Sequence, residues 1–123
     1  MAKGTLTLTG PADNIAEAGT GVTVQAQVTN YGEGPFPFKV EGEIDGVSLD
    51  FGPERWLESG QTWYFEAYHE MPLNDALVTV RSYYGSGVGE WYLDNTRTLT
   101  IYLPAPPEEG GFQNLAILDY SKV

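Results

Sequence analysis

The residues able to perform acid–base or nucleophilic chemistry form no recognisable catalytic motif in this chain. Its single histidine is His69, so a Ser–His–Asp relay could run only through that residue. No G-x-S-x-G or H-E-x-x-H motif occurs in the sequence. The 17 acidic residues allow carboxylate pairs to be chosen at will, so such a pair discriminates nothing. We interpret His69 as a loop histidine and predict a protein that is not an enzyme.

Three Asp/Asn pairs offer the hard oxygen ligands that calcium prefers. They are Asp13-Asn14, Asn74-Asp75 and Asp94-Asn95, with Glu90 near the last pair. None has the D-x-D-x-D-G spacing of a calcium loop, and turn-forming Asx hydrogen bonds explain all three. The absence of cysteine excludes disulfides and thiolate metal sites. We therefore assign no metal ligand and no cofactor, and a bound calcium ion remains the alternative.

Aromatic residues form a second group with binding chemistry: 3 Trp, 8 Tyr and 5 Phe. On a pleated strand, Tyr64 and Tyr68 point away from Phe65, and Tyr83 points away from Tyr84. An exposed row of Tyr64, Tyr68 and Tyr83 could stack on sugar rings or pack on a protein neighbour. The alternative is that one member of each pair lies in the core while the other covers a strand edge.

The C-terminal segment has a different composition from the rest of the chain. Residues 104–111 read PAPPEEGG, a linker that is rich first in proline and then in glycine. Residues 112–123 read FQNLAILDYSKV, an apolar arm that could add as a strand to the open sheet edge of a neighbour. Its predicted docking residues are Phe112, Leu115, Ile117, Leu118 and Tyr120. The alternative is a disordered end with incidental apolar residues.

The elements that must position these residues are β-strands. Between residues 21 and 30, Val22, Val24 and Val28 alternate with polar residues, the period of a strand with one dry face. A second alternating run spans residues 36–44, and Asp45-Gly46 after it is a strong two-residue hairpin signal. Asn30 and Gly32 between the two runs tolerate the positive φ that a reversal needs.

Further alternating runs extend the pattern along the chain. They span residues 4–9, 47–51, 62–68 and 76–84, and a last run ends at Leu99, Ile101 and Leu103. Residues 13–20 read as a loop or a single helical turn, and residues 54–58 as a crossing between layers. The pattern predicts an all-β fold, an immunoglobulin-like antiparallel β-sandwich of about seven strands with a C-terminal extension. The predicted core residues are Val24, Val28, Phe38, Val40, Trp63, Phe65, Val78, Val80, Leu99 and Ile101.

Length and charge limit the function classes. A chain of 123 residues is one domain, which we place at residues 1–103, followed by the 104–111 linker and the 112–123 arm. The net charge of −11 disfavours nucleic acid and anionic membranes as partners. No apolar run approaches a membrane span, and the first residues do not read as a secretory signal.

Several motifs resemble the CARDB-type bacterial cell-adhesion-related domain over roughly residues 5–103. The family pattern of a strand ending in V-x-N-x-G followed by a D-G turn falls on Val28, Asn30, Gly32, Asp45 and Gly46. Its later positions fall on Leu57, Gly60, Phe65 and Asn95. The family's acidic-Asn-Asn ending is reduced here to Asp94-Asn95-Thr96. The resemblance implies an immunoglobulin-like sandwich that acts as a non-catalytic module of large exported proteins.

We predict a non-enzymatic structural or interaction protein, a β-sandwich that decorates or joins a larger assembly such as a virion capsid surface. Its partners would be protein subunits of the same or a larger assembly, in an oligomeric arrangement on a virion surface or outside the cell. The alternative is an adhesion or carbohydrate-binding module of an exported bacterial or archaeal protein.

Overall fold

The structure, a computed structural model that describes residues 2–105, consists of eight β-strands and one short 3₁₀ turn. The six long strands are β1 (Gly4–Thr9), β2 (Gly21–Asn30), β3 (Phe36–Ile44), β6 (Thr62–Glu70), β7 (Ala76–Gly85) and β8 (Trp91–Ile101). Two strands of three residues, β4 (Val47–Leu49) and β5 (Arg55–Leu57), lie between β3 and β6. The 3₁₀ turn η1 covers Ala12–Asn14.

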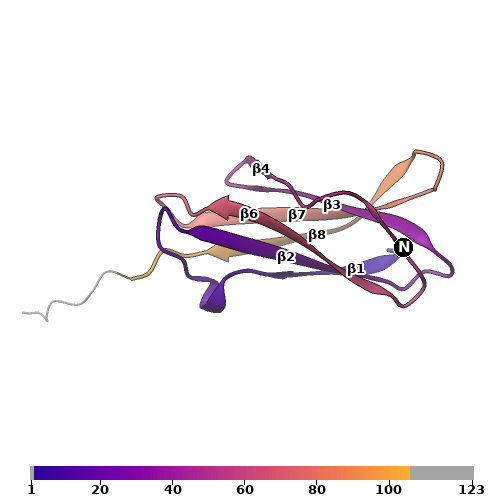
Figure 1. Cartoon of the computed structure of the whole chain (residues 1–123), viewed down its shortest axis with the longest axis horizontal. Helices are drawn as coiled ribbons and strands as arrows, with labels where there is room; N and C mark the ends of the chain where they lie inside the picture. Colours follow the sequence, from indigo (N-terminus) through magenta and orange to yellow (C-terminus); the bar gives the residue numbers. More distant parts are fainter. Residues whose placement is uncertain (1, 106–123) are drawn as a thin grey trace, which may run out of the picture.

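The strands form two antiparallel sheets that lie one behind the other (Figure 1). One sheet has the order β1-β2-β6, and the other has the order β4-β3-β7-β8 with β5 also paired to β3. The first, second and fourth long strands thus share one sheet, while the third, fifth and sixth share the other. This distribution is that of an immunoglobulin-like sandwich, as the sequence predicted. Beside the seven predicted strands the structure adds β5, where the sequence indicated only a crossing.

The hairpin between β3 and β4 follows directly from its sequence. Asp45 and Gly46 have φ values of 49° and 82°, and Ile44 pairs with Val47 across the two-residue turn. Positive φ at both central residues is the requirement of the turn type that matches strand twist. The Asp45 carboxylate also accepts a hydrogen bond from the Leu77 N–H at 2.9 Å, which ties the turn to β7.

The core lies between the sheets and takes side chains from both. Eight of the ten predicted core residues are buried, including Phe38 at 0% and Phe65 at 2% exposure. Trp63 and Leu99 differ: both are partly buried and pack against the core from its margin. Trp63 lies near the start of an edge strand, where the indole ring is stacked by Arg55 rather than enclosed. The last strand, predicted to end with Leu99, Ile101 and Leu103, is β8 and ends at Ile101.

Asn30 joins four segments of the chain from a fully buried position. Its amide nitrogen donates to the carbonyls of Leu57 at 2.9 Å and Gly34 at 3.0 Å, and its side-chain oxygen accepts from the Gly32 N–H at 2.8 Å. Its backbone N–H donates to Gln61. The sequence assigned Asn30 and Gly32 to a reversal with positive φ. The positive φ falls on Gly34 instead, and Asn30 acts through its amide.

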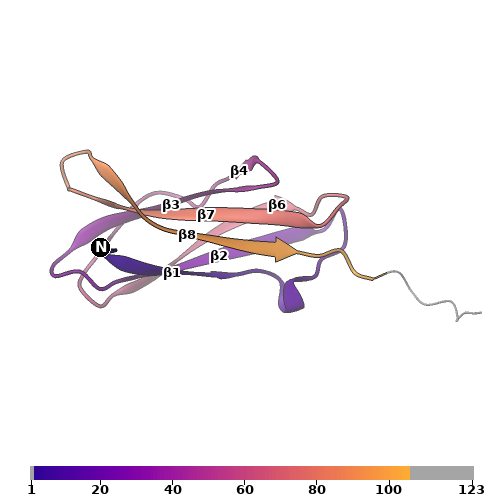
Figure 2. The same cartoon turned by 180° about the vertical axis from the view of Figure 1, so that it is seen from behind.

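The sandwich is closed along the side where β1 meets β8 (Figure 2). The Asp94 carboxylate accepts hydrogen bonds from the N–H groups of Lys3 at 2.7 Å and Gly4 at 3.0 Å. The Asn95 amide donates to the Gly4 carbonyl at 2.8 Å. Near the other end of these strands, Tyr102 forms an isolated bridge with Ile15. Side-chain and backbone bonds thus join the first and last strands across the two sheets.

Truncation of either core phenylalanine should strongly destabilise the domain. Phe38→Ala and Phe65→Ala each remove a buried ring from between the sheets, and we expect a loss of about 3–5 kcal/mol in unfolding free energy. Tyr64→Ala is the matched control, because Tyr64 is 51% exposed beside Phe65 on the same strand. Chemical denaturation measures all three. Equal losses for Tyr64→Ala and Phe65→Ala would contradict the assignment of faces on β6.

Replacement of Asn30 should destabilise the domain through unmet polar groups. Asn30→Ala leaves the buried Leu57 carbonyl without its donor, and one such group costs about 1–3 kcal/mol. Asn30→Asp keeps the shape but turns a second acceptor toward two carbonyls, so the loss should be at least as large at pH 7. Asn74→Ala is the control and should cost less, because its amide bonds to Asp45 and Asp75 are exposed to solvent. A wild-type melting temperature for Asn30→Asp would contradict this role.

Candidate functional site

Strand β6 forms the open edge of the three-stranded sheet. Among the described residues it pairs with β2 alone, in continuous register from Gly21 opposite Glu70 to Thr29 opposite Thr62. The edge of β6 that faces away from β2 therefore has no strand partner within residues 2–105, over all nine residues of the strand. Near its start, the Arg55 guanidinium stacks on the Trp63 ring at 3.5 Å from the centroid. A strand edge of this kind presents N–H and C=O groups to which another chain can pair.

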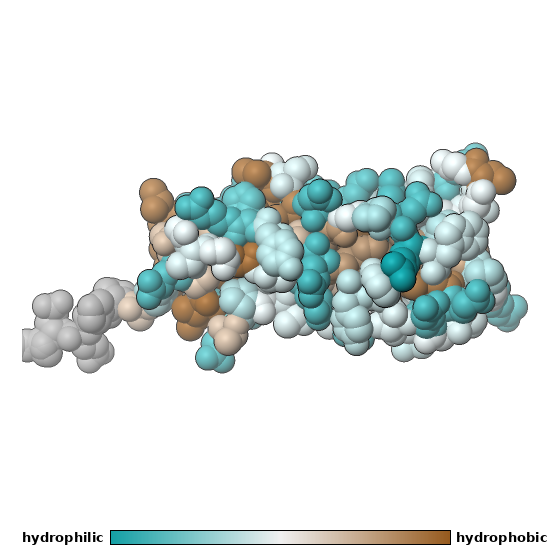
Figure 3. Space-filling view, viewed as in Figure 1, coloured by the Kyte–Doolittle hydropathy of each residue, from teal (hydrophilic) through white to brown (hydrophobic). Residues whose placement is uncertain are grey.

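The outer face beside this edge is polar and carries two of the predicted tyrosines. Tyr64 and Tyr68 are 51% and 72% exposed, as the alternation predicted. Glu66 between them accepts a hydrogen bond from Gln25 on β2 at 3.1 Å. On the face seen in Figure 3 hydrophilic residues predominate, and smaller hydrophobic areas show between them. The polar neighbours of the two tyrosines include Glu66 and Gln25.

Tyr83, the third predicted aromatic, lies on β7 in the other sheet. It is half-buried, and the Lys39 ammonium lies 5.3 Å from its ring centroid. The structure thus brings Tyr64 and Tyr68 to one face but does not bring Tyr83 to them. The sequence could not reveal this separation, because alternation assigns a residue to a face of its own strand and not to a sheet.

The Asp/Asn pairs have structural roles in the described chain. Asp94 and Asn95 hold the start of β1, as described above, and Asp75 accepts a hydrogen bond from the Leu103 N–H at 2.9 Å. Asp13 and Asn14 adopt positive φ in the η1 turn. Glu90 accepts a hydrogen bond from the Tyr92 hydroxyl at 2.7 Å, and this carboxylate raises the pKa of Tyr92. Residues 2–105 hold no group of three or more metal-ligating side chains.

His69 is not in a loop, which corrects the sequence-based interpretation. It is the penultimate residue of β6 and pairs with Val22. Its Nδ1 lies 2.6 Å from the Glu70 carbonyl oxygen. The strand runs two residues further than the aromatic alternation indicated, because β2 continues to supply pairing partners as far as Gly21.

The predicted docking residues of the arm, from Phe112 to Tyr120, lie outside the described residues. The same holds for most of the predicted linker, of which Pro104 and Ala105 are described and exposed. Within residues 2–105 no helix has the length and apolarity needed to cross a membrane.

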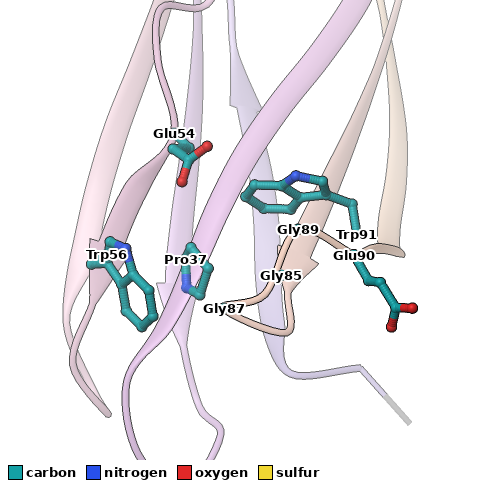
Figure 4. A pocket seen from close by; sticks show the side chains of 8 residues that line it. All are labelled: Pro37, Glu54, Trp56, Gly85, Gly87, Gly89, Glu90 and Trp91. Atoms are coloured by element: carbon teal, nitrogen blue, oxygen red, sulfur yellow. The ribbon is translucent and has the colours of Figure 1, made fainter.

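A cleft that the sequence did not reveal lies beside the turn between β7 and β8. It has a volume of about 180 Å³ and is bordered by Trp56, Trp91, Glu54 and the glycine-rich turn. Figure 4 shows the two indoles on opposite sides, with Pro37 between them. We call this space the tryptophan cleft. The spacing of 35 residues between the two tryptophans contains no signal for it, because only strand pairing brings them together.

A salt bridge spans β3 and β7 on the outer face of the larger sheet. Arg81 binds the Glu43 carboxylate with both terminal nitrogens, one of them at 3.2 Å. Hydrogen bonding from Arg81 is the main cause that lowers the pKa of Glu43, and the same pair raises the pKa of Arg81. Both side chains are partly exposed, so solvent screens the interaction and its contribution to stability is modest.

Comparison with known proteins shows the fold alone. No protein-family profile and no curated protein sequence matches the chain. Two solved structures are similar: the Pseudomonas fluorescens alkylpurine DNA glycosylase AlkC, determined with DNA containing an abasic site analog, and the sporulation control protein Spo0M from Bacillus subtilis. TM-scores are 0.52 and 0.51, with 11% identity in each case. The matches cover 85% and 86% of this chain but only 31% and 51% of those proteins.

The Glu43–Arg81 pair should make stability depend on acid. The pKa of Glu43 is lower in the folded chain than in the unfolded chain. The ionised carboxylate therefore makes its full contribution to stability at pH values above the pKa of the unfolded chain. This contribution is lost as the pH falls through the pKa of the folded chain. The melting temperature of Glu43→Gln should therefore lie below wild type at pH 7 and converge toward wild type near pH 3. A constant difference across this range would contradict the linkage.

Proposed function

We propose that this protein is a non-enzymatic interaction module that joins a larger assembly through the open edge of β6. The observation that carries the proposal is the nine-residue strand with a single partner among residues 2–105. Strand addition at such an edge gives affinity through backbone hydrogen bonds, while side chains on alternate positions give specificity. Tyr64 and Tyr68 are the side chains that would contact an added strand at this edge.

The occupant that we propose is the 112–123 arm of a second copy of the chain. Leaving Leu115, Ile117 and Leu118 in water would forgo roughly 1.5–3 kcal/mol each relative to full burial. The eight linker residues 104–111 reach about 25 Å if they are extended like polyproline. A linker of this length lets the arm extend away from its own domain and pair with another molecule. The last described residues and the end of β6 lie at the same end of the sandwich (Figure 1), so docking on the parent chain is the competing arrangement.

The setting that we propose for the assembly is a virion surface, where small immunoglobulin-like modules can decorate a capsid. Support for this setting is an analogy at the level of the fold. An adhesion or carbohydrate-binding module of an exported protein is the second candidate, favoured by the exposed tryptophan of the cleft.

Removal of residues 112–123 should dissociate the oligomer into monomers without unfolding the sandwich. We expect the full chain to form oligomers, measured by size-exclusion chromatography with light scattering. The truncated chain should be monomeric with a melting temperature close to that of the isolated full-length monomer. A full chain that stays monomeric at high concentration would contradict arm exchange. A truncated chain that melts far lower would show that the arm is an intramolecular strand.

Proline substitutions in the arm test for a strand ladder. Neighbouring N–H groups of a strand point to opposite edges, so only one of Ile117 and Leu118 donates to β6. Because proline removes one donor, Ile117→Pro and Leu118→Pro should weaken assembly to different extents. Ser121→Pro, beyond the predicted docking residues, is the control. Wild-type assembly by both test variants would rule out strand addition.

A further inference from the structure

The tryptophan cleft is built by a row of residues that crosses four strands. Trp56 on β5 pairs with Pro37 on β3, and Gly85 on β7 pairs with Trp91 on β8. Pro37 and Gly85 are adjacent: a Cβ on Gly85 would lie 2.9 Å from the Pro37 ring and 3.2 Å from the Trp91 ring. The middle of the row is thus low and buried, whereas its two ends carry indoles. This arrangement makes a groove with aromatic walls on the outer face of the larger sheet.

The turn from Gly85 to Glu90 keeps the cleft open at its end. Gly87 and Gly89 have φ values of 87° and 99°, which favour glycine. A Cβ on Gly87 would come within 3.5 Å of the Trp56 ring, so a side chain there would fill the space. The volume of about 180 Å³ is below the roughly 300–1,000 Å³ of sites for drug-sized ligands. It suits a single six-membered ring.

The charges around the cleft favour a neutral ligand. Glu54 reaches toward the space between the indoles, whereas Glu90 points away from it (Figure 4). The Glu90 carboxylate accepts a hydrogen bond from the Tyr92 hydroxyl. These carboxylates and the net charge of −11 oppose an anion. The Lys39 ammonium lies 4.8 Å from the Trp91 ring centroid, so that ring already holds a cation, which would repel a second one. A neutral molecule with hydroxyl groups avoids both repulsions.

We propose that the tryptophan cleft binds a neutral pyranose ring. The C–H groups on one face of the sugar would lie against an indole, whose π face is negative. A sugar hydroxyl would donate to the Glu54 carboxylate, a charge-assisted hydrogen bond of the stronger kind. Trp56, which is 56% exposed, supplies accessible stacking surface. The cleft lies on the sheet opposite to β6, so this site is independent of arm docking.

The indole N–H signals of the three tryptophans give a direct test by NMR. Methyl β-D-glucopyranoside, methyl β-D-galactopyranoside and methyl α-D-mannopyranoside are titrated separately into the full chain. At least one should shift the signals of Trp56 and Trp91 with a Kd on the order of 1 mM, as expected for a ligand of about 13 non-hydrogen atoms. Trp63, on the other sheet under Arg55, should not move.

Variants and charged probes decide between outcomes. Trp56→Ala should weaken binding at least tenfold and Glu54→Gln several-fold, while Tyr64→Ala combined with Tyr68→Ala should leave the Kd unchanged. Trp91→Phe provides a second test that preserves packing on Gly85. The proposal is overturned if no neutral pyranoside shifts either indole signal up to about 50 times the expected Kd. It is also overturned if tetramethylammonium or glucuronate binds as tightly as the neutral pyranoside. A shift of the Trp63 signal equal to those of Trp56 and Trp91 would overturn it too.

Discussion

The buried side-chain amide of Asn30 connects several segments of this sandwich by hydrogen bonds. Asn30 is fully enclosed where β2 leaves the smaller sheet, and its side chain bonds to the loop before β3 and to the end of β5. Its backbone bonds to the turn that starts β6. Burying a polar group costs free energy unless its hydrogen-bond partners are present. The position of β5, and with it Trp56 and Arg55, therefore depends on this residue, and both candidate surfaces depend on β5.

The two sides of the sandwich differ in how their strands are joined. On one side, Asp94 and Asn95 bond the start of β1 to β8, which brings the first and last strands of the described domain together across the sheets. On the other side, β6 has a partner only in β2 within residues 2–105. Edge strands left unprotected invite pairing with other chains. Glu66 and Glu70 on the exposed face of β6 oppose like-charged copies of the same edge, so self-pairing of two β6 strands is disfavoured.

The sequence predicted the local structure well because alternation and turn chemistry are local properties. The β3–β4 hairpin, the limits of β3 and the dry face of β2 all follow from residues that are neighbours in sequence. Pairing between distant strands left no such pattern. The separation of Tyr83 from Tyr64, the position of His69 within β6 and the meeting of Trp56 with Trp91 all depend on register set over many residues. The sequence marks Asn30 as a boundary, but its hydrogen bonds reach Leu57, which no local rule connects to it.

Charge connects the two proposed interactions. With a net charge of −11, copies of this chain repel one another at long range, and at physiological salt the repulsion decays over about 8 Å. The arm contains one Asp and one Lys, so its docking brings little further charge to an acidic surface. A backbone ladder consists of hydrogen bonds formed at contact distance, and it needs no charge pairing. A neutral sugar in the tryptophan cleft is insensitive to the same field. Both interactions are thus of kinds that an acidic domain can sustain without neutralising its surface.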